Sequence, residues 1–117
     1  APAVQEVAKV EPLRRDIFFT ISSTKIVNEE MSKVAEIAEY LTKYPAAKVV
    51  ITGYADKGTG NAKINSGLAA KRAKAVVDAL VNNYGISSSR ISSDSKGDTV
   101  QPFAEHVKNR VSICIAQ

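Results

Sequence analysis

The chain has 117 residues, of which 44% are hydrophobic and 24% are charged, a composition typical of one globular domain. Its 16 basic and 12 acidic residues give a net charge of +4, but the two signs are interspersed and no basic run exceeds Arg14-Arg15, so we expect no nucleic-acid-binding surface. No apolar run reaches the roughly 18 to 20 residues that a membrane-spanning helix needs, and we expect no direct membrane insertion of this domain.

The first half of the chain predicts a linker followed by a strand, a helix and a second strand. Residues 1–15 mix prolines with small and charged residues, which is typical of a linker. The apolar run Asp16–Ile21 predicts a strand, and apolar residues at helical spacing predict a helix over Asn28–Tyr44. Ala47–Thr52 then predicts the second strand.

The second half predicts one long helix and two further strands. The expected elements are a helix from Asn61 to Tyr84, a strand over Arg90–Ser93, a turn at Lys96–Asp98, a short helical turn at Pro102–Val107 and a last strand over Arg110–Ala116. Asn28 is the expected N-cap of the first helix, with Glu29 and Glu30 in its first turn, where the helix dipole favours negative charge. Gly85 is the expected C-terminal cap of the second helix.

The order β-α-β-α-β-β predicts an α/β (α+β) two-layer sandwich. We expect a mixed four-stranded sheet with two main helices on one face. The predicted domain organisation is a linker over residues 1–15 and one folded domain over residues 16–117.

The glycine-rich stretch from Gly53 to Arg72, GYADKGTGNAKINSGLAAKR, first suggests a phosphate-binding loop. Gly53 and Gly58 match the first half of that motif, but Thr59 and Gly60 stand where lysine and serine or threonine are required. Asp56 would also repel an anion. A nucleotide site is therefore not expected, and we predict no cofactor.

Catalytic and metal sites are not expected either. The chain has one histidine, His106, without the motif of a nucleophilic serine, and one cysteine, Cys114, in an apolar run that predicts burial. These residues offer neither a catalytic set nor the soft ligands of a zinc site, so we predict that the protein is not an enzyme.

Asp56 and Arg72 are the candidate binding pair. Asp56 follows the second strand, and Arg72 lies two to three turns inside the following helix, so the loop and the helix can bring both side chains to one cleft. Such a pair suits a zwitterion, because Asp56 would accept from an ammonium group and Arg72 would bind a carboxylate. The spacing alone favours an ordinary Asp–Arg surface ion pair over such a site.

The same residues resemble the OmpA-like (OmpA/MotB C-terminal) peptidoglycan-binding domain, over nearly the whole chain from Asp16 onward. The matching elements, in order, are Gly53-Tyr54-Ala55-Asp56, then Asn65, Leu68, Ala69, Arg72 and Ala73, then Gly85-Ile86 and Arg90-Ile91, then Gly97-Asp98 with Gln101-Pro102, and finally Asn109-Arg110-Val111. No single element is specific, but their ordered combination is.

The resemblance implies non-catalytic binding of the peptide stem of peptidoglycan, chiefly its meso-diaminopimelate. Carried over to this chain, Asp56 and Arg72 hold the amino and carboxylate groups of that residue and Asn65 shapes the site. The loop after the first strand, Ser22 and Ser23, lines the pocket, and Arg110 from the last strand is a further ligand-binding candidate.

The resemblance also implies a place in the cell. The expected location is the periplasm of a Gram-negative bacterium, in association with the outer membrane. We expect residues 1–15 to connect the domain to an outer-membrane domain or a lipid anchor outside this chain, which would anchor an envelope protein to the cell wall.

The chain departs from the family pattern at several positions. Tyr54-Ala55 replaces the usual His-Thr, Thr20 stands where an acidic residue is common, and the interval from Asp56 to Arg72 is one residue longer than usual. These changes motivate an alternative hypothesis, in which the domain keeps the fold without binding the ligand and acts as a structural or protein-interaction domain.

Overall fold

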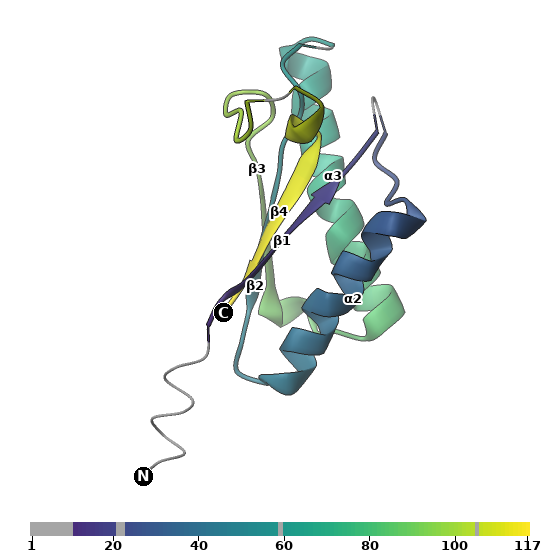
Figure 1. The fold of residues 1–117 in the computed structure, drawn as a ribbon, viewed down its shortest axis with the longest axis vertical. Coiled ribbons are helices and arrows are strands. Elements are labelled where there is room, and N and C mark those ends of the chain that lie inside the picture. Colours follow the sequence, from purple (N-terminus) through teal and green to yellow (C-terminus); the bar gives the residue numbers. More distant parts are fainter. Residues whose placement is uncertain (1–10, 21–22, 59, 105) are drawn as a thin grey trace.

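The computed structural model describes residues 11–20, 23–58, 60–104 and 106–117, without the side chains of residues 106 and 107 (Figure 1). The helices and strands are β1 (Leu13–Phe18), α2 (Asn28–Lys43), β2 (Val49–Gly53), α3 (Ala62–Tyr84), β3 (Ile91–Ser95) and β4 (Val111–Ala116), with single 3₁₀ turns at Ser88–Arg90 and His106–Asn109. This order confirms the predicted β-α-β-α-β-β arrangement.

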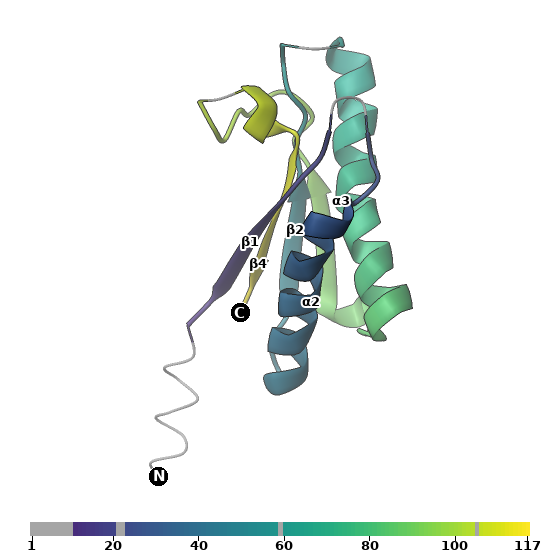
Figure 2. The same cartoon turned by 45° about the vertical axis from the view of Figure 1, so that its right-hand side comes forward.

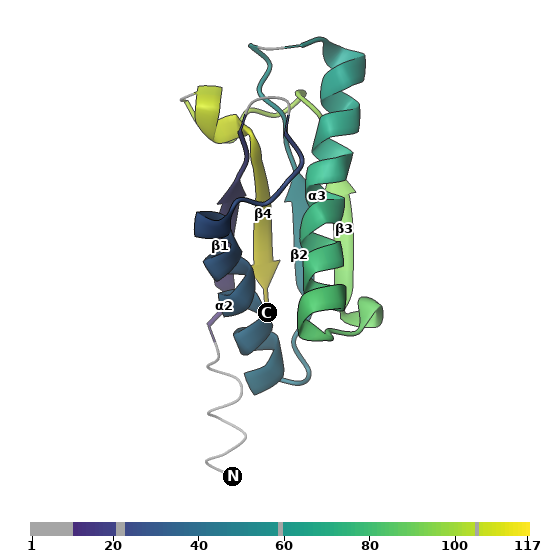
Figure 3. The same ribbon diagram turned by 90° about the vertical axis from the view of Figure 1, so that its right-hand side faces the viewer.

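The four strands form one mixed sheet in the order β1-β4-β2-β3. β4 is antiparallel to both β1 and β2, whereas β2 and β3 are parallel. Helices α2 and α3 cover the same face of the sheet, which leaves the other face open (Figures 2 and 3). The predicted two-layer α+β sandwich is thus confirmed.

The core lies between the sheet and the two helices. Alternate strand residues point inward, among them Ile17, Val49, Ile51 and Cys114, and all four are fully buried. They meet the apolar stripes of the helices, which are Val34, Ile37, Ala38 and Leu41 on α2, and Ala69, Ala73, Val76, Ala79 and Leu80 on α3. The burial of Cys114 was predicted from its apolar run.

Helix α3 packs against β2 at unusually short range, because Gly53 has no side chain. A Cβ atom placed on Gly53 would overlap the carbonyl oxygen of Ala69 and lie 3.1 Å from the main-chain nitrogen of Ala73. The alanine-rich composition of α3 is therefore explained by close helix–sheet packing, since larger residues at positions 69 and 73 would hold the helix away.

β1 begins and ends three residues before the strand that the sequence predicted. Leu13 to Arg15, which we expected in the linker, pair with residues 114–116 of β4. Arg14 and Asp16 form an ion pair (Nε–Oδ1, 3.0 Å), which lets charged residues occupy the strand. After Phe18 the chain leaves the sheet, and Ile21 lies outside the described residues.

The other strands differ from the prediction by one or two residues, but one helix cap was wrong. Asn28 is the first residue of α2, and the capping position is Val27, whose carbonyl accepts from Glu30 and Met31. The C-terminal cap of α3 was predicted correctly, whereas Asn61, which we expected as the first residue of this helix, is its N-cap. Asn61 accepts from the Ile64 amide, and Gly85 adopts the left-handed conformation with φ 67°.

Glu30 does more than complement the helix dipole. Its carboxylate accepts from the Phe18 amide (2.7 Å) and from Lys33 (2.9 Å), whose ammonium group also donates to the Asp16 carbonyl (2.8 Å). These bonds satisfy main-chain groups of β1, which is an edge strand, and so join α2 to the sheet.

Candidate functional site

The candidate site lies at the edge of the sheet where β1, β2 and β3 end and β4 begins. Because these three strands run parallel, their carboxyl ends meet at one edge, as expected for a ligand site in an open sheet. The chain segments that follow β1, β2 and β3 come together there with the first half of α3 (Figure 3).

Asp56 is buried, with 3% of its surface exposed, and its two carboxylate oxygens have different partners. Oδ1 accepts from the amide of Gly58 (2.8 Å), two residues ahead, which stabilises the turn after β2. Oδ2 forms an ion pair with Nη2 of Arg110 (3.2 Å). The Asp56 carboxylate thus joins the loop after β2 to Arg110, the residue directly before β4.

Arg72 is the largest fully buried side chain in the described structure, with 1% exposure. It directs its hydrogen bonds to main-chain carbonyls: Nε donates to Ser23 (2.9 Å), Nη1 to Tyr54 (3.1 Å) and Nη2 to Thr20 (3.3 Å). The Phe19 ring lies 5.5 Å from the guanidinium carbon. The side chain therefore holds the segments after β1 and β2 against α3.

Burial lowers the pKa of Arg72, but the side chain keeps its positive charge. Desolvation, with a further contribution from the positive charge of Arg110, lowers its pKa to about 10, while the negative charge of Asp56 raises it. Arg72 remains protonated at neutral pH. The Asp56 carboxylate forms its ion pair with Arg110, while the hydrogen bonds of Arg72 go to main-chain carbonyls.

Asn65 and Gln101 complete the framework of the loop. Asn65 is 1% exposed, and its Nδ2 donates to the Asp56 carbonyl (3.3 Å) and to Oδ2 of Asp98 (3.0 Å). Gln101 donates through Nε2 to the Ala55 carbonyl (3.0 Å) and accepts from the Lys57 amide (3.1 Å). Gln101 was noted only as part of a motif, because nothing in its sequence context indicates a partner 46 residues away.

Arg110 is the most solvent-accessible of the three charged residues at the site. Its side chain is 16% exposed, against 2% for Asp56. Its Nε is buried and has no hydrogen-bond partner, a condition that it shares, among the described residues, with the hydroxyl of Ser112. A buried N–H without a partner is rare in proteins and marks a donor that water or a ligand can satisfy.

Of the two serines that were predicted to line the pocket, the structure describes only Ser23. Ser22 lies outside the described residues. Ser23 contributes its carbonyl, which accepts from Arg72, while its hydroxyl accepts from the Lys25 amide (3.2 Å). The structure therefore brings Asp56, Asn65, Arg72, Arg110 and the Ser23 main chain together.

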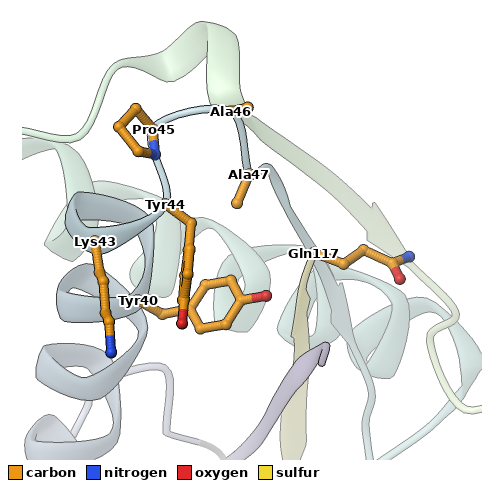
Figure 4. Close-up of a pocket in the computed structure, with 7 residues that line it drawn as sticks. All are labelled: Tyr40, Lys43, Tyr44, Pro45, Ala46, Ala47 and Gln117. Atoms are coloured by element: carbon orange, nitrogen blue, oxygen red, sulfur yellow. The ribbon is translucent and has the colours of Figure 1, made fainter. Parts of the chain in front are cut away.

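A separate hollow of about 400 Å³ lies at the opposite end of β2. Tyr40, Lys43, Tyr44, Pro45, Ala46, Ala47 and Gln117 line it (Figure 4). None of the predicted site residues belongs to this hollow, since they follow the carboxyl end of β2 and Ala47 precedes its amino end.

Within residues 11–20, 23–58, 60–104 and 106–117, no helix combines the length and the apolar composition needed to cross a bilayer.

Known proteins resemble this chain in sequence. Outer membrane protein 41 of Porphyromonas gingivalis is 36% identical over 114 residues, which are 96% of this chain and 29% of that protein. The peptidoglycan-associated lipoprotein of Rhizobium meliloti is 36% identical over 81 residues, covering 69% of this chain and 45% of that protein. The chain thus spans less than half the length of these relatives.

Solved structures share the fold. The peptidoglycan-associated lipoprotein from Burkholderia pseudomallei superposes with a TM-score of 0.80 at 24% identity, covering 88% of this chain and 90% of that one. The C-terminal domain of Helicobacter pylori MotB gives a TM-score of 0.69 at 28% identity, covering 89% and 82%. The sequence model of the OmpA family matches residues 18–112, and the chain belongs to that family of cell-envelope proteins.

Proposed function

We propose that this domain binds the diaminopimelate-containing stem peptide of peptidoglycan and so anchors an envelope protein to the cell wall without catalysis. The observation that carries the proposal is the cluster of Asp56, Arg72 and Arg110, in which a rigidly held carboxylate lies beside two guanidinium groups. A negative and a positive group side by side match the ammonium and carboxylate of an amino acid.

The relatives support this proposal. One is named as an outer membrane protein and another as a peptidoglycan-associated lipoprotein, and both are longer than this chain. We place the domain in the periplasm of a Gram-negative bacterium, joined through the residues before β1 to an outer-membrane domain or a lipid anchor.

Co-sedimentation with purified, diaminopimelate-containing sacculi tests the function. Asp56→Asn removes the negative charge while its amide oxygen still accepts from the Gly58 amide. We expect binding to fall about tenfold or more, as for the loss of a charge-assisted hydrogen bond. Asp78→Asn is the matched control, because Asp78 lies on the exposed side of α3 in an ion pair with Lys74.

An alternative function is a structural or protein-interaction domain that has no ligand at this site. It is favoured by the engagement of Arg72 with three main-chain carbonyls, which is a sufficient structural reason for this residue. Equal sedimentation of the wild type and Asp56→Asn would support this alternative and contradict the proposed site.

A further inference from the structure

We infer that the hollow at the amino end of β2 binds residues 1–10 of this same chain, which lie outside the described residues. The surface belongs to the end of the domain away from the candidate site. Binding of this segment does not depend on the proposed function.

The hollow is lined mainly by apolar groups. Tyr40 and Tyr44 lie four residues apart at the C-terminal end of α2, with ring centroids 4.9 Å apart and an interplanar angle of 57° (Figure 4). Both rings are partly buried against the hydrophobic core. The Pro45 ring and the methyl groups of Ala46 and Ala47 complete the apolar lining of a volume of about 400 Å³. Tyrosine rings of this kind, apolar at the face and polar at the tip, are enriched at binding interfaces.

The described chain begins at the margin of this hollow. Glu11, the first described residue, lines a second hollow of about 350 Å³, and Tyr40, Lys43 and Tyr44 line both hollows. The Tyr40 hydroxyl donates to the Glu11 carbonyl (2.9 Å). Residues 1–10 are therefore joined to the domain at a residue that contacts the wall of the hollow.

Residues 1–10 have a composition that suits an apolar surface. Their sequence, APAVQEVAKV, contains Val4, Val7 and Val10 among alanines and one proline. Burial of these side chains against the tyrosine rings is favourable because it removes apolar surface from water.

The length of the segment and its attachment favour it over a free partner. Ten residues span at most about 33 Å when extended, which is ample for a hollow that begins beside Glu11. Because the segment is tethered there, its effective concentration at the hollow is about millimolar, so that weak contacts suffice to hold it.

The charges at the margin are also compatible with this occupant. Glu39 and Lys43 line the second hollow with one charge of each sign, and neither belongs to an ion pair within the described residues. Residues 1–10 likewise carry one acidic and one basic side chain, Glu6 and Lys9. The segment can therefore bind without placing an excess of either charge at the surface.

Binding of the segment would control the reach of the domain. Up to about 33 Å of chain would be held against the domain, and its release would lengthen the connection to the protein that the domain anchors. This consequence alone rests on the proposed function.

The experiment observes the whole chain by NMR, with ¹³C-labelled valine methyl groups. We expect nuclear Overhauser contacts from the methyl groups of Val4 and Val7 to the ring protons of Tyr40 and Tyr44. The double variant Val4→Ser/Val7→Ser should lose these contacts and shift the amide signals of residues 43–47. Both substitutions lie outside the described fold, so the domain should stay folded.

A second variant tests the hollow from the other side. Tyr44→Leu removes one ring, and the contacts from Val4 and Val7 to the remaining ring of Tyr40 should be lost or strongly reduced. Ile64→Ser is the matched control, because Ile64 is an exposed apolar side chain (52%) at the start of α3, outside both hollows, and this variant should keep the contacts.

Three results would overturn the inference. They are the absence of contacts from Val4 and Val7 to either ring in the wild type, amide signals of residues 43–47 that do not respond to Val4→Ser/Val7→Ser, and contacts that disappear on dilution, which would assign the hollow to residues 1–10 of a second copy. None of these measurements involves peptidoglycan, so failure of the proposed function would leave the inference standing, and the reverse also holds.

Discussion

Replacing Gly53 by alanine should destabilise the domain strongly, although the change adds a single methyl group. The new Cβ would overlap the carbonyl oxygen of Ala69 and lie 2.9 Å from its carbonyl carbon and 3.1 Å from the Ala73 nitrogen. All three are main-chain atoms of α3, so no side-chain rotation can relieve the overlap, and the helix must move away from β2.

Overpacking of this kind costs about 1 to 3 kcal/mol, and we expect the upper end because the opposing atoms belong to a helix backbone. For a domain of this size, about 3 kcal/mol corresponds to a fall in Tm of roughly 10 °C or more. Thermal unfolding followed by circular dichroism measures the effect. Since α3 carries both Asn65 and Arg72, binding to sacculi should weaken as well.

Gly67→Ala is the matched control, because Gly67 lies in the same helix with nothing within 4 Å of an added Cβ. Alanine is the better helix former, so this change should stabilise the domain by about 0.5 to 1 kcal/mol. Opposite signs for the two substitutions are the expected result. A Gly53→Ala variant as stable as the wild type would refute the close packing of α3 on β2.

Two further predictions concern the core and its margins. Arg90→Ala should lower the free energy of unfolding by about 2 to 3 kcal/mol, measured by urea unfolding. The reason is that the Arg90 guanidinium donates to the carbonyls of Leu41, Tyr44 and Ala47, at and after the C-terminus of α2. Arg90→Lys should lose less stability, and an unchanged urea midpoint for Arg90→Ala would contradict this capping role. Cys114 is fully buried, and desolvation raises the pKa of its thiol. A thiol reagent should therefore modify the native protein at least about a thousandfold more slowly than the urea-unfolded chain. Rapid labelling in buffer would show that this part of the core opens.

The order of the elements could be predicted from the sequence because each helix presents an apolar stripe and β2 and β4 are mainly apolar, although β3 is a polar strand. The boundaries of β1 could not. Its three aromatic and aliphatic residues, Ile17 to Phe19, suggested a strand centred on them, yet Phe19 lies beside the Arg72 guanidinium in the loop. The charged residues Arg14 and Asp16 belong to the strand because they face the open side of the sheet, where they pair with each other.

The sequence also predicted residues that the fold brings close together, but not their bonds. Asp56, Asn65, Arg72 and Arg110 all lie near the end of the sheet where β2 ends and β4 begins, and Asp56 pairs with Arg110. The partners of Arg72 are main-chain carbonyls from two other segments. Every residue has a carbonyl group, so no residue type in the sequence marks these acceptors, and only the folded backbone shows where they converge.

The longer loop between Asp56 and Arg72 is accommodated without loss of this geometry. Gly60 takes the left-handed conformation with φ 70°, and a Cβ there would lie 3.0 Å from Oδ1 of Asn65, so this position favours glycine on both counts. Asn65 in turn holds the Asp56 carbonyl, while the Asp56 carboxylate bonds to the Gly58 amide within the same loop. Because these contacts fix Asp56 from both sides of the loop, the carboxylate keeps one oxygen directed at Arg110. The structural reason for these glycines is therefore a rigidly held carboxylate beside the Arg110 guanidinium group.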